Sequence, residues 1–342
     1  MNFSSLSPKQ VVPFIIRCVN NNLVPFIQGS PGIGKSDMVK RIAEMGNLKV
    51  IDLRLSQCDP TDLQGFPMRV GNKAEYVPFN TFPIEGDPIP EGYSGWLLFL
   101  DEFNGATKSV QMAAYKLVLD RQVGMHKLHE KVAIVCAGNL TTDRAVTNNL
   151  STAMQSRLIH FELEVSKADW IDWALQNNID NRIIGFIEYQ PSKLHSFKPD
   201  HQDKTFASPR TWEFVSRLIK NEEITGNDLP LISGTISEGV AVEFIKFCAV
   251  YQKLPKINEI LIDPEKYNIP SDMGVKYATI IHLMEHTEPS NISNITKYVN
   301  RFSPEFQVIY YKNLVAKDPT YRMNTDVVSS LQRLLRFIND DS

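Results

Sequence analysis

The first half of the chain alternates apolar runs with patterns of helical spacing. Apolar residues three and four apart predict helices over 8–20, 36–45 and 109–119. Between them lie short apolar runs typical of buried strands, at 23–28, 49–55, 96–100 and 132–137, with a last strand at 158–163. Strands that alternate with helices predict an α/β fold, in which a parallel sheet carries helices on both faces.

Beyond residue 163 the strand signals fade and helical patterns take over. We therefore predict two domains, an α/β domain over 1–163 and an all-α domain over 164–342. The segment 64–95 is rich in proline and glycine, too broken for a core element and too long for a plain connector. The predicted helices of the second domain cover 168–176, 182–189, 209–220, 239–252, 273–286 and 327–338.

Composition narrows the class of protein. The longest apolar runs fall far short of the roughly 18 residues that span a bilayer, and the N-terminus lacks the layout of a secretory signal. Four widely scattered cysteines argue against a disulfide framework or a cysteine-bound zinc ion. The net charge of -3 argues against a protein that coats duplex DNA. We expect a soluble, cytoplasmic protein.

The strongest chemical signal follows the first predicted strand and opens the next helix. The segment 29–36 matches the phosphate-binding pattern G-x-x-x-x-G-K-[ST] in full. Its glycines let successive backbone N–H groups point at an anion, which favours nucleotide binding over a chance turn. We expect Lys35 to reach the β- and γ-phosphates and Ser36 to place its hydroxyl on Mg²⁺. The cradle consists of Gly29, Ser30, Pro31, Gly32, Ile33, Gly34, Lys35 and Ser36.

Two later strands end in polar residues of matching chemistry. The apolar run 96–100 delivers Asp101 and Glu102, and the run 132–137 is followed by Gly138 and Asn139. At the carboxyl edge of a parallel sheet, Asp101 would hold Mg²⁺ and Glu102 would deprotonate the attacking water. Asn139 would bind the γ-phosphate and the water. Taken alone, each is also compatible with an ordinary polar turn.

The order of these segments resembles that of AAA+ ATPases, and most closely of their MoxR-like branch. GSPGIGKS (29–36), LFLDEFN (98–104), VCAGN (135–139), AMQSR (153–157) and SPRTW (208–212) are similar to the successive motifs of that family. The resemblance implies a P-loop α/β domain followed by an all-α lid, with ATP and Mg²⁺ as cofactors. It also implies a homo-oligomeric ring, typically a hexamer, that hydrolyses ATP.

The same resemblance assigns catalytic roles to arginines. Arg157 falls at the position of the arginine finger that reaches the γ-phosphate of a neighbouring subunit. Arg144 is a second candidate for this finger, and the sequence does not choose between the two. Arg210 aligns with the sensor that couples the lid to nucleotide. Gly105 stands where many MoxR-like proteins carry an arginine, so any contact made by that arginine is in doubt.

The resemblance further implies two insertions that face the substrate, around 69–83 and as a hairpin at 121–131. It suggests a protein client, often one with a von Willebrand factor A domain, and no membrane. The hairpin carries five basic residues or histidines against one acid, so a nucleic-acid motor or loader is the alternative. A non-hydrolysing scaffold is a third possibility. The pattern after about residue 260 fits either an extended lid or a partner-binding surface.

Overall fold

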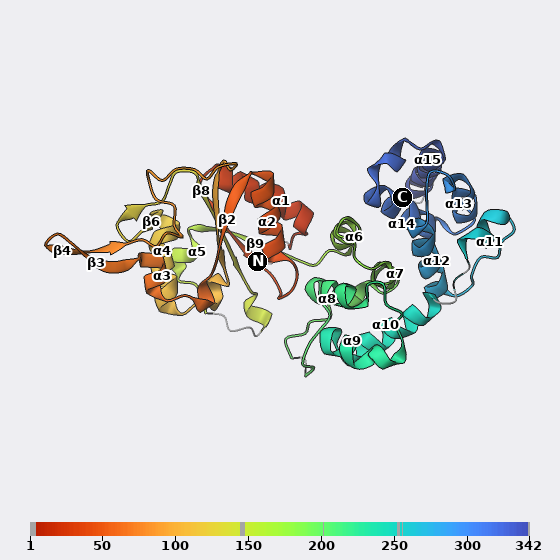
Figure 1. Ribbon diagram of the computed structural model, residues 1–342, viewed down its shortest axis with the longest axis horizontal. Coiled ribbons are helices and arrows are strands. Elements are labelled where there is room, and N and C mark those ends of the chain that lie inside the picture. Colours follow the sequence, from red (N-terminus) through yellow and green to blue (C-terminus); the bar gives the residue numbers. More distant parts are fainter. Residues whose placement is uncertain (1–4, 144–147, 201, 252–253, 255, 341–342) are drawn as a thin grey trace. The chain divides into compact units, whose positions relative to one another are not determined.

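The computed structural model describes residues 5–143, 148–200, 202–251, 254 and 256–340. The chain divides into two units (Figure 1). The N-terminal unit comprises Met1–Val165 and Lys198–Asp200, and the helical unit comprises Ser166–Phe197 and His201–Ser342. Each unit is built around its own core.

Five parallel strands form the sheet of the N-terminal unit. The predicted α/β fold with a parallel sheet is confirmed. The strand β1, which leads into the phosphate-binding segment, has β8 on one side and β9 on the other. The order across the sheet is β2 (Leu48–Arg54), β5 (Gly95–Asp101), β8 (Val132–Gly138), β1 (Val24–Gln28) and β9 (Leu158–Glu162).

Alternation along the central strands explains why both faces of the sheet are covered. Leu97 and Phe99 of β5 are fully buried in one apolar cluster, whereas Leu98 and Leu100 are buried in another on the opposite face. The first cluster includes residues of α1 (Pro8–Asn20) and α2 (Lys35–Met45). The second includes residues of α3 (Pro60–Gln64), α4 (Lys108–Leu119) and α5 (Thr152–Gln155).

Two hairpins extend from the face that carries α4. The segment predicted as a broken excursion contains the antiparallel pair β3 (Phe66–Val70) and β4 (Lys73–Val77), joined through Gly71 at φ 61°. The hairpin predicted at 121–131 is present as β6 (Gln122–Val123) and β7 (His126–Lys127). Periodicity did not reveal β3 and β4 because residues 66–69 of β3 and 73–76 of β4 are exposed on a strand pair that contributes little to the core.

The helical unit buries a chain of aromatic rings between its helices. Phe186 lies 5.6 Å from Trp212 and 5.4 Å from Phe244, measured between ring centroids. No helix within the described ranges is long and apolar enough to cross a membrane. The helices are α6 (Lys167–Gln176), α7 (Asn181–Tyr189), α8 (Pro209–Ile219), α9 (Leu229–Ile236), α10 (Glu238–Tyr251), α11 (Ile257–Ile262), α12 (Met273–Glu285), α13 (Ile292–Val299), α14 (Pro304–Lys317) and α15 (Thr325–Asp340).

Candidate functional site

The carboxyl ends of β1, β5 and β8 meet at one edge of the sheet. Because β8 lies between β5 and β1, the segments that follow these three strands are neighbours. Phe26 of β1 pairs with Cys136 of β8, and Leu100 of β5 pairs with the same residue from the other side. The residues predicted to carry the chemistry are therefore brought together by the topology.

The phosphate-binding segment curls as its pattern predicts. Gly32 and Gly34 adopt positive φ angles of 78° and 91°, a conformation that side chains rarely accept. A Cβ atom on Gly29 would lie 2.9 Å from the carbonyl oxygen of Leu163, so this position has no room for a side chain. The loop then opens directly into α2, whose N-terminus points its free N–H groups at the same place.

Lys35 is buried and lies across this loop. Its Nζ donates to the carbonyl oxygens of Gly29 and Ser30, at 2.5 and 3.0 Å, and to Oδ1 of Asn139 at 3.2 Å. These contacts join the phosphate loop to the end of β8. The ammonium group is thus held at the position from which a lysine contacts the phosphates of a bound nucleotide.

Ser36 and Asp101 supply oxygen atoms suited to Mg²⁺. The Ser36 hydroxyl donates to Oδ2 of Asp101 at 3.0 Å, and both residues are only partly buried. The other carboxylate oxygen, Oδ1, accepts from the backbone N–H of Glu102 at 2.8 Å. A hydroxyl and a carboxylate are hard oxygen donors of the kind that Mg²⁺ prefers, so this pair fits the metal.

Glu102 is held in an unusual backbone conformation. Its φ of 53° and ψ of 35° lie in the left-handed region, which non-glycine residues occupy at an energetic cost and often at functional sites. Its carboxylate accepts a hydrogen bond from the hydroxyl of Ser56, which follows β2 in the short 3-10 helix Leu55–Gln57. The backbone turn and the serine together fix the direction in which the carboxylate points.

Asn139 is positioned by a second asparagine. Asn104 donates from Nδ2 to the carbonyl oxygen of Asn139 at 2.7 Å and accepts at Oδ1 from its backbone N–H at 3.1 Å. A Cβ atom on Gly138 would collide with that Oδ1, so glycine is required for the two bonds to form. Asn104 itself is buried, with 2% of its surface exposed.

Sequence reasoning missed the roles of Ser56 and Asn104. Asn104 stands inside a segment quoted for the family resemblance and Ser56 directly follows the predicted strand 49–55, but neither side chain carries a charge. Asn104 comes two residues after Glu102, and Ser56 comes two residues after the end of β2. Only the pairing of β5 with β2 and β8 brings these residues to Glu102 and Asn139.

Two of the three predicted arginines, Arg157 and Arg210, lie within the described residues. Arg157 is exposed at the end of α5, where Nη1 donates to the carbonyl oxygen of Ala153 at 2.9 Å and the guanidinium lies 5.6 Å from the ring of Tyr115. Arg210 is exposed at the second position of α8 in the helical unit. Arg144 lies outside the described residues. Their roles toward nucleotide stay predictions.

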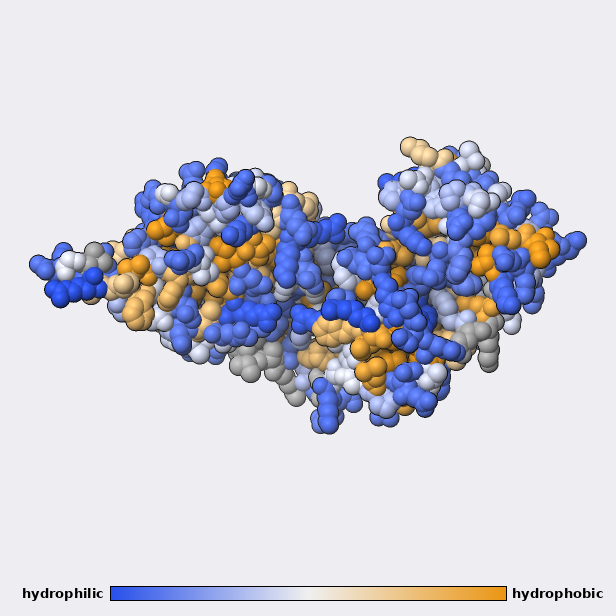
Figure 2. Space-filling view, in the orientation of Figure 1, coloured by the Kyte–Doolittle hydropathy of each residue, from blue (hydrophilic) through white to orange (hydrophobic). Residues whose placement is uncertain are grey.

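A groove lies between the two hairpins and α4. It has a volume of about 350 Å³ and is lined in part by Met112 and Met125, which are 77% and 75% exposed. Figure 2 shows apolar colour at the base of the β3–β4 hairpin and hydrophilic colour at its tip. The lining consists of Leu63, Gln64, Tyr76, Met112, Ala113, Lys116, Gln122, Gly124 and Met125.

Two of the five basic residues or histidines in the 121–131 hairpin, Arg121 and His129, contact other parts of the protein. The guanidinium of Arg121 donates to the carbonyl oxygen of Val132, and burial lowers its pKa. The ring of His129 lies 5.0 Å from that of Trp96, and its Nδ1 accepts from the N–H of Lys131 at 3.0 Å. These two side chains are therefore engaged within the protein rather than directed at a partner.

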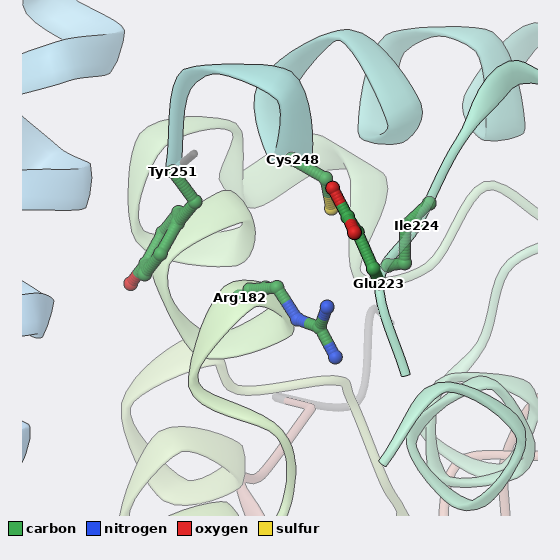
Figure 3. Close-up of a pocket in the computed structure, with 5 residues that line it drawn as sticks. All are labelled: Arg182, Glu223, Ile224, Cys248 and Tyr251. Atoms are coloured by element: carbon green, nitrogen blue, oxygen red, sulfur yellow. The ribbon is translucent and has the colours of Figure 1, made fainter. Parts of the chain in front are cut away.

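The helical unit holds a small pocket of about 160 Å³ beside Arg182 (Figure 3). The guanidinium donates to both carboxylate oxygens of Asp180, at 2.9 and 2.7 Å, and to the carbonyl oxygens of Ile219 and Glu222, each at 2.7 Å. Burial raises the pKa of the nearby Cys248 thiol to about 12, so this thiol is not a nucleophile at neutral pH. The pocket surrounds a structural arginine.

Comparison with known proteins agrees with this geometry. Residues 25–158 match the profile of the AAA domain of the dynein-related subfamily. Midasin from Giardia intestinalis is 24% identical over 173 residues, which are 47% of this chain but 3% of midasin.

Among solved structures, NtrX from Brucella abortus in complex with ATP is 13% identical, with 99% of this chain and 69% of that chain covered and a TM-score of 0.41. A point mutant of RuvB from Thermotoga maritima is 13% identical, with 74% of this chain and 80% of that chain covered and a TM-score of 0.37. Residues 25–158 are therefore similar to the AAA domain of the dynein-related subfamily, and the site geometry agrees with this similarity.

Proposed function

We propose that this chain is a MoxR-like AAA+ ATPase that hydrolyses ATP with Mg²⁺ in a hexameric ring and remodels a protein client in the cytoplasm. The observation that carries the proposal is the convergence of Lys35, Asn139, Ser36, Asp101 and Glu102 at one edge of the sheet. A scaffold that only binds nucleotide has no need of a carboxylate held by a strained backbone.

Each side chain has a distinct task in this mechanism. Lys35 would contact the β- and γ-phosphates, and Ser36 and Asp101 would hold Mg²⁺, which when bound would neutralise charge on the phosphate oxygens. Glu102 accepts the proton of the attacking water, and the Asn139 amide orders that water against the γ-phosphate. Ser56 and Asn104 act as positioning residues, because each bonds to one of the two groups that face the water.

A second subunit completes the site in this proposal. Leu158 pairs with Val24 at the start of β1, so Arg157 lies at the amino edge of the sheet, whereas the phosphate loop follows the carboxyl edge. The five residues of β9 separate these edges by about 16 Å at ~3.3 Å per residue. An exposed arginine at that edge is suited to a neighbour's γ-phosphate. Arg210 serves as the lid's sensor.

The groove supports a protein as the client. Exposed methionines adapt to varied apolar side chains, and Met112 and Met125 flank the single lysine of the lining, Lys116. By the family resemblance, a protein with a von Willebrand factor A domain is a fitting client. The structural engagement of Arg121 and His129 disfavours the nucleic-acid motor.

The test separates hydrolysis from binding. We expect Glu102→Gln to bind ATP as the wild type does while phosphate release falls by roughly 10²–10⁴-fold, because the general base is lost and the phosphate contacts remain. The trapped ATP should favour the ring, which sedimentation measures. Glu130→Gln, on an exposed turn residue, is the matched control. Hydrolysis at the wild-type rate by Glu102→Gln would falsify the assignment.

Client and alternatives are tested with the same variant. Glu102→Gln in ATP should retain client protein, and Met112→Ser with Met125→Ser should reduce retention without changing hydrolysis. The motor alternative instead predicts that single-stranded DNA stimulates hydrolysis and that salt removes the effect. A scaffold would release no phosphate under any of these conditions.

A further inference from the structure

Two histidines and a glutamate meet on the last turn of α12, in the helical unit. The chain reads His282-Leu283-Met284-Glu285-His286, so the two imidazoles stand four residues apart on one face of the helix. One ligand atom from each of His282, Glu285 and His286 lies within 4.8 Å of the other two. The imidazole rings are 4.5 Å apart, measured between centroids.

We infer that His282, Glu285 and His286 form a binding site for a divalent transition-metal ion of the zinc class. Two imidazole nitrogens with one carboxylate oxygen are a donor set typical of zinc, with a solvent molecule as fourth ligand. Ligands of a tetrahedral zinc ion lie roughly 3.3 Å from one another, given bond lengths of about 2.0–2.2 Å, so modest side-chain rotation closes the site.

One tautomer is already selected. Nδ1 of His286 lies 3.0 Å from the carbonyl oxygen of His282, and because a carbonyl only accepts, Nδ1 carries the proton. The lone pair is therefore on Nε2, free to bind a metal. Metal-binding histidines commonly donate their other ring N–H to a backbone carbonyl in this way.

The surroundings favour a cation. The site lies at the C-terminal end of α12, where the last carbonyl groups carry partial negative charge. His282 is partly buried against the ring of Tyr251 on α10, with centroids 6.5 Å apart. Lys317 of α14 donates to the backbone carbonyl oxygen of Glu285 at 3.4 Å, so its ammonium group contacts the main chain.

The site supports binding and not hydrolysis. The order His-x-x-Glu-His also occurs in zinc peptidases, where the glutamate serves as the base and a further ligand comes from another segment. In the described part of the chain, only these three residues form a cluster of metal-ligating side chains. An ion here would fasten the end of α12 through its own side chains and stabilise the helical unit.

The test measures zinc binding by the full chain after a chelator has removed bound metal ions. Nucleotide is left out, and Mg²⁺ is added in excess so that it competes for the oxygen atoms of Ser36 and Asp101. We expect one Zn²⁺ per chain by calorimetry, and binding at least roughly tenfold weaker for His286→Gln, whose side chain is exposed. His126→Gln, on the β6–β7 hairpin, is the matched control and should bind like the wild type.

Two further readouts keep the proposal falsifiable. Co²⁺ in place of Zn²⁺ should give visible absorption bands of a tetrahedral site in the wild type and lose them in His286→Gln. Zn²⁺ should raise the melting temperature of the wild type and of His126→Gln, but not that of His286→Gln. Absence of zinc binding by the wild type, unchanged affinity in His286→Gln, or loss of binding in His126→Gln each overturns the proposal. Circular dichroism checks that the variants are folded.

Discussion

Lys35 and Arg182 are both largely buried cations, and the two units hold them with different partners. The contacts of Lys35 include three neutral oxygen atoms, from Gly29, Ser30 and Asn139. Arg182 instead makes two bonds to the carboxylate of Asp180. Neutral oxygen atoms position a cation without cancelling its charge, whereas a carboxylate cancels it. The first arrangement suits a phosphate ligand and the second suits a helix core.

Among the predictions that test this comparison, the largest effect is expected from replacing the structural arginine, Arg182. Arg182→Ala leaves the Asp180 carboxylate buried without its cation, so we expect the helical unit to lose about 3 kcal/mol of unfolding free energy. Denaturant unfolding followed by tryptophan fluorescence reports on this unit, which contains three of the four tryptophans. Arg217→Ala, which breaks an exposed pair with Glu213, should cost less than about 0.5 kcal/mol. Equal losses would contradict the comparison.

Next in size is the loss of the nucleotide-binding cation. Lys35→Ala should weaken ATP binding by roughly 100-fold, because charge-assisted bonds to the phosphates disappear. Fluorescent-nucleotide titration measures this. Lys40→Ala, on the exposed side of the same helix, should leave the affinity unchanged. If both variants bind alike, the phosphates do not contact Lys35.

A smaller effect is expected when the support of Asn139 is removed. Asn104→Ala deprives the backbone of Asn139 of two partners, and a lost buried partner costs about 1–3 kcal/mol. We expect hydrolysis to fall roughly tenfold with ATP affinity nearly unchanged, measured by steady-state kinetics and titration. Gly138→Ala should reproduce the defect, since its methyl group would displace the Asn104 side chain. A normal rate in both would remove Asn104 from the site.

The smallest effect concerns the hydroxyl that orients Glu102. Ser56→Ala removes one hydrogen bond to a partly exposed carboxylate, so we expect a change in the hydrolysis rate of about tenfold or less. Single-turnover phosphate release measures it. Ser56→Thr retains the hydroxyl and should retain the rate. If Ser56→Thr lowers the hydrolysis rate as much as Ser56→Ala does, the rate does not depend on the hydroxyl group at this position.

Helix and strand positions of the core were predictable because their patterns are local. The predicted helix 8–20 coincides with α1, and the run 132–137 with β8 but for one residue. Helices α9, α11, α13 and α14 were missed. α14 is buried along several sides, as the burial of Phe306, Tyr310 and Asn313 shows, so its sequence lacks a single apolar stripe.

The sequence by itself determined the phosphate loop, the two carboxylates at the end of β5 and the parallel sheet, since each depends on residues adjacent in the chain. Tertiary structure alone decided that Asn104 supports Asn139, that Ser56 holds Glu102 and that Arg121 is committed to Val132. These pairs join segments whose separation in sequence carries no periodic signal. Strand order and register create them, because a hydrogen bond acts over about 3 Å and is indifferent to the length of chain between its partners.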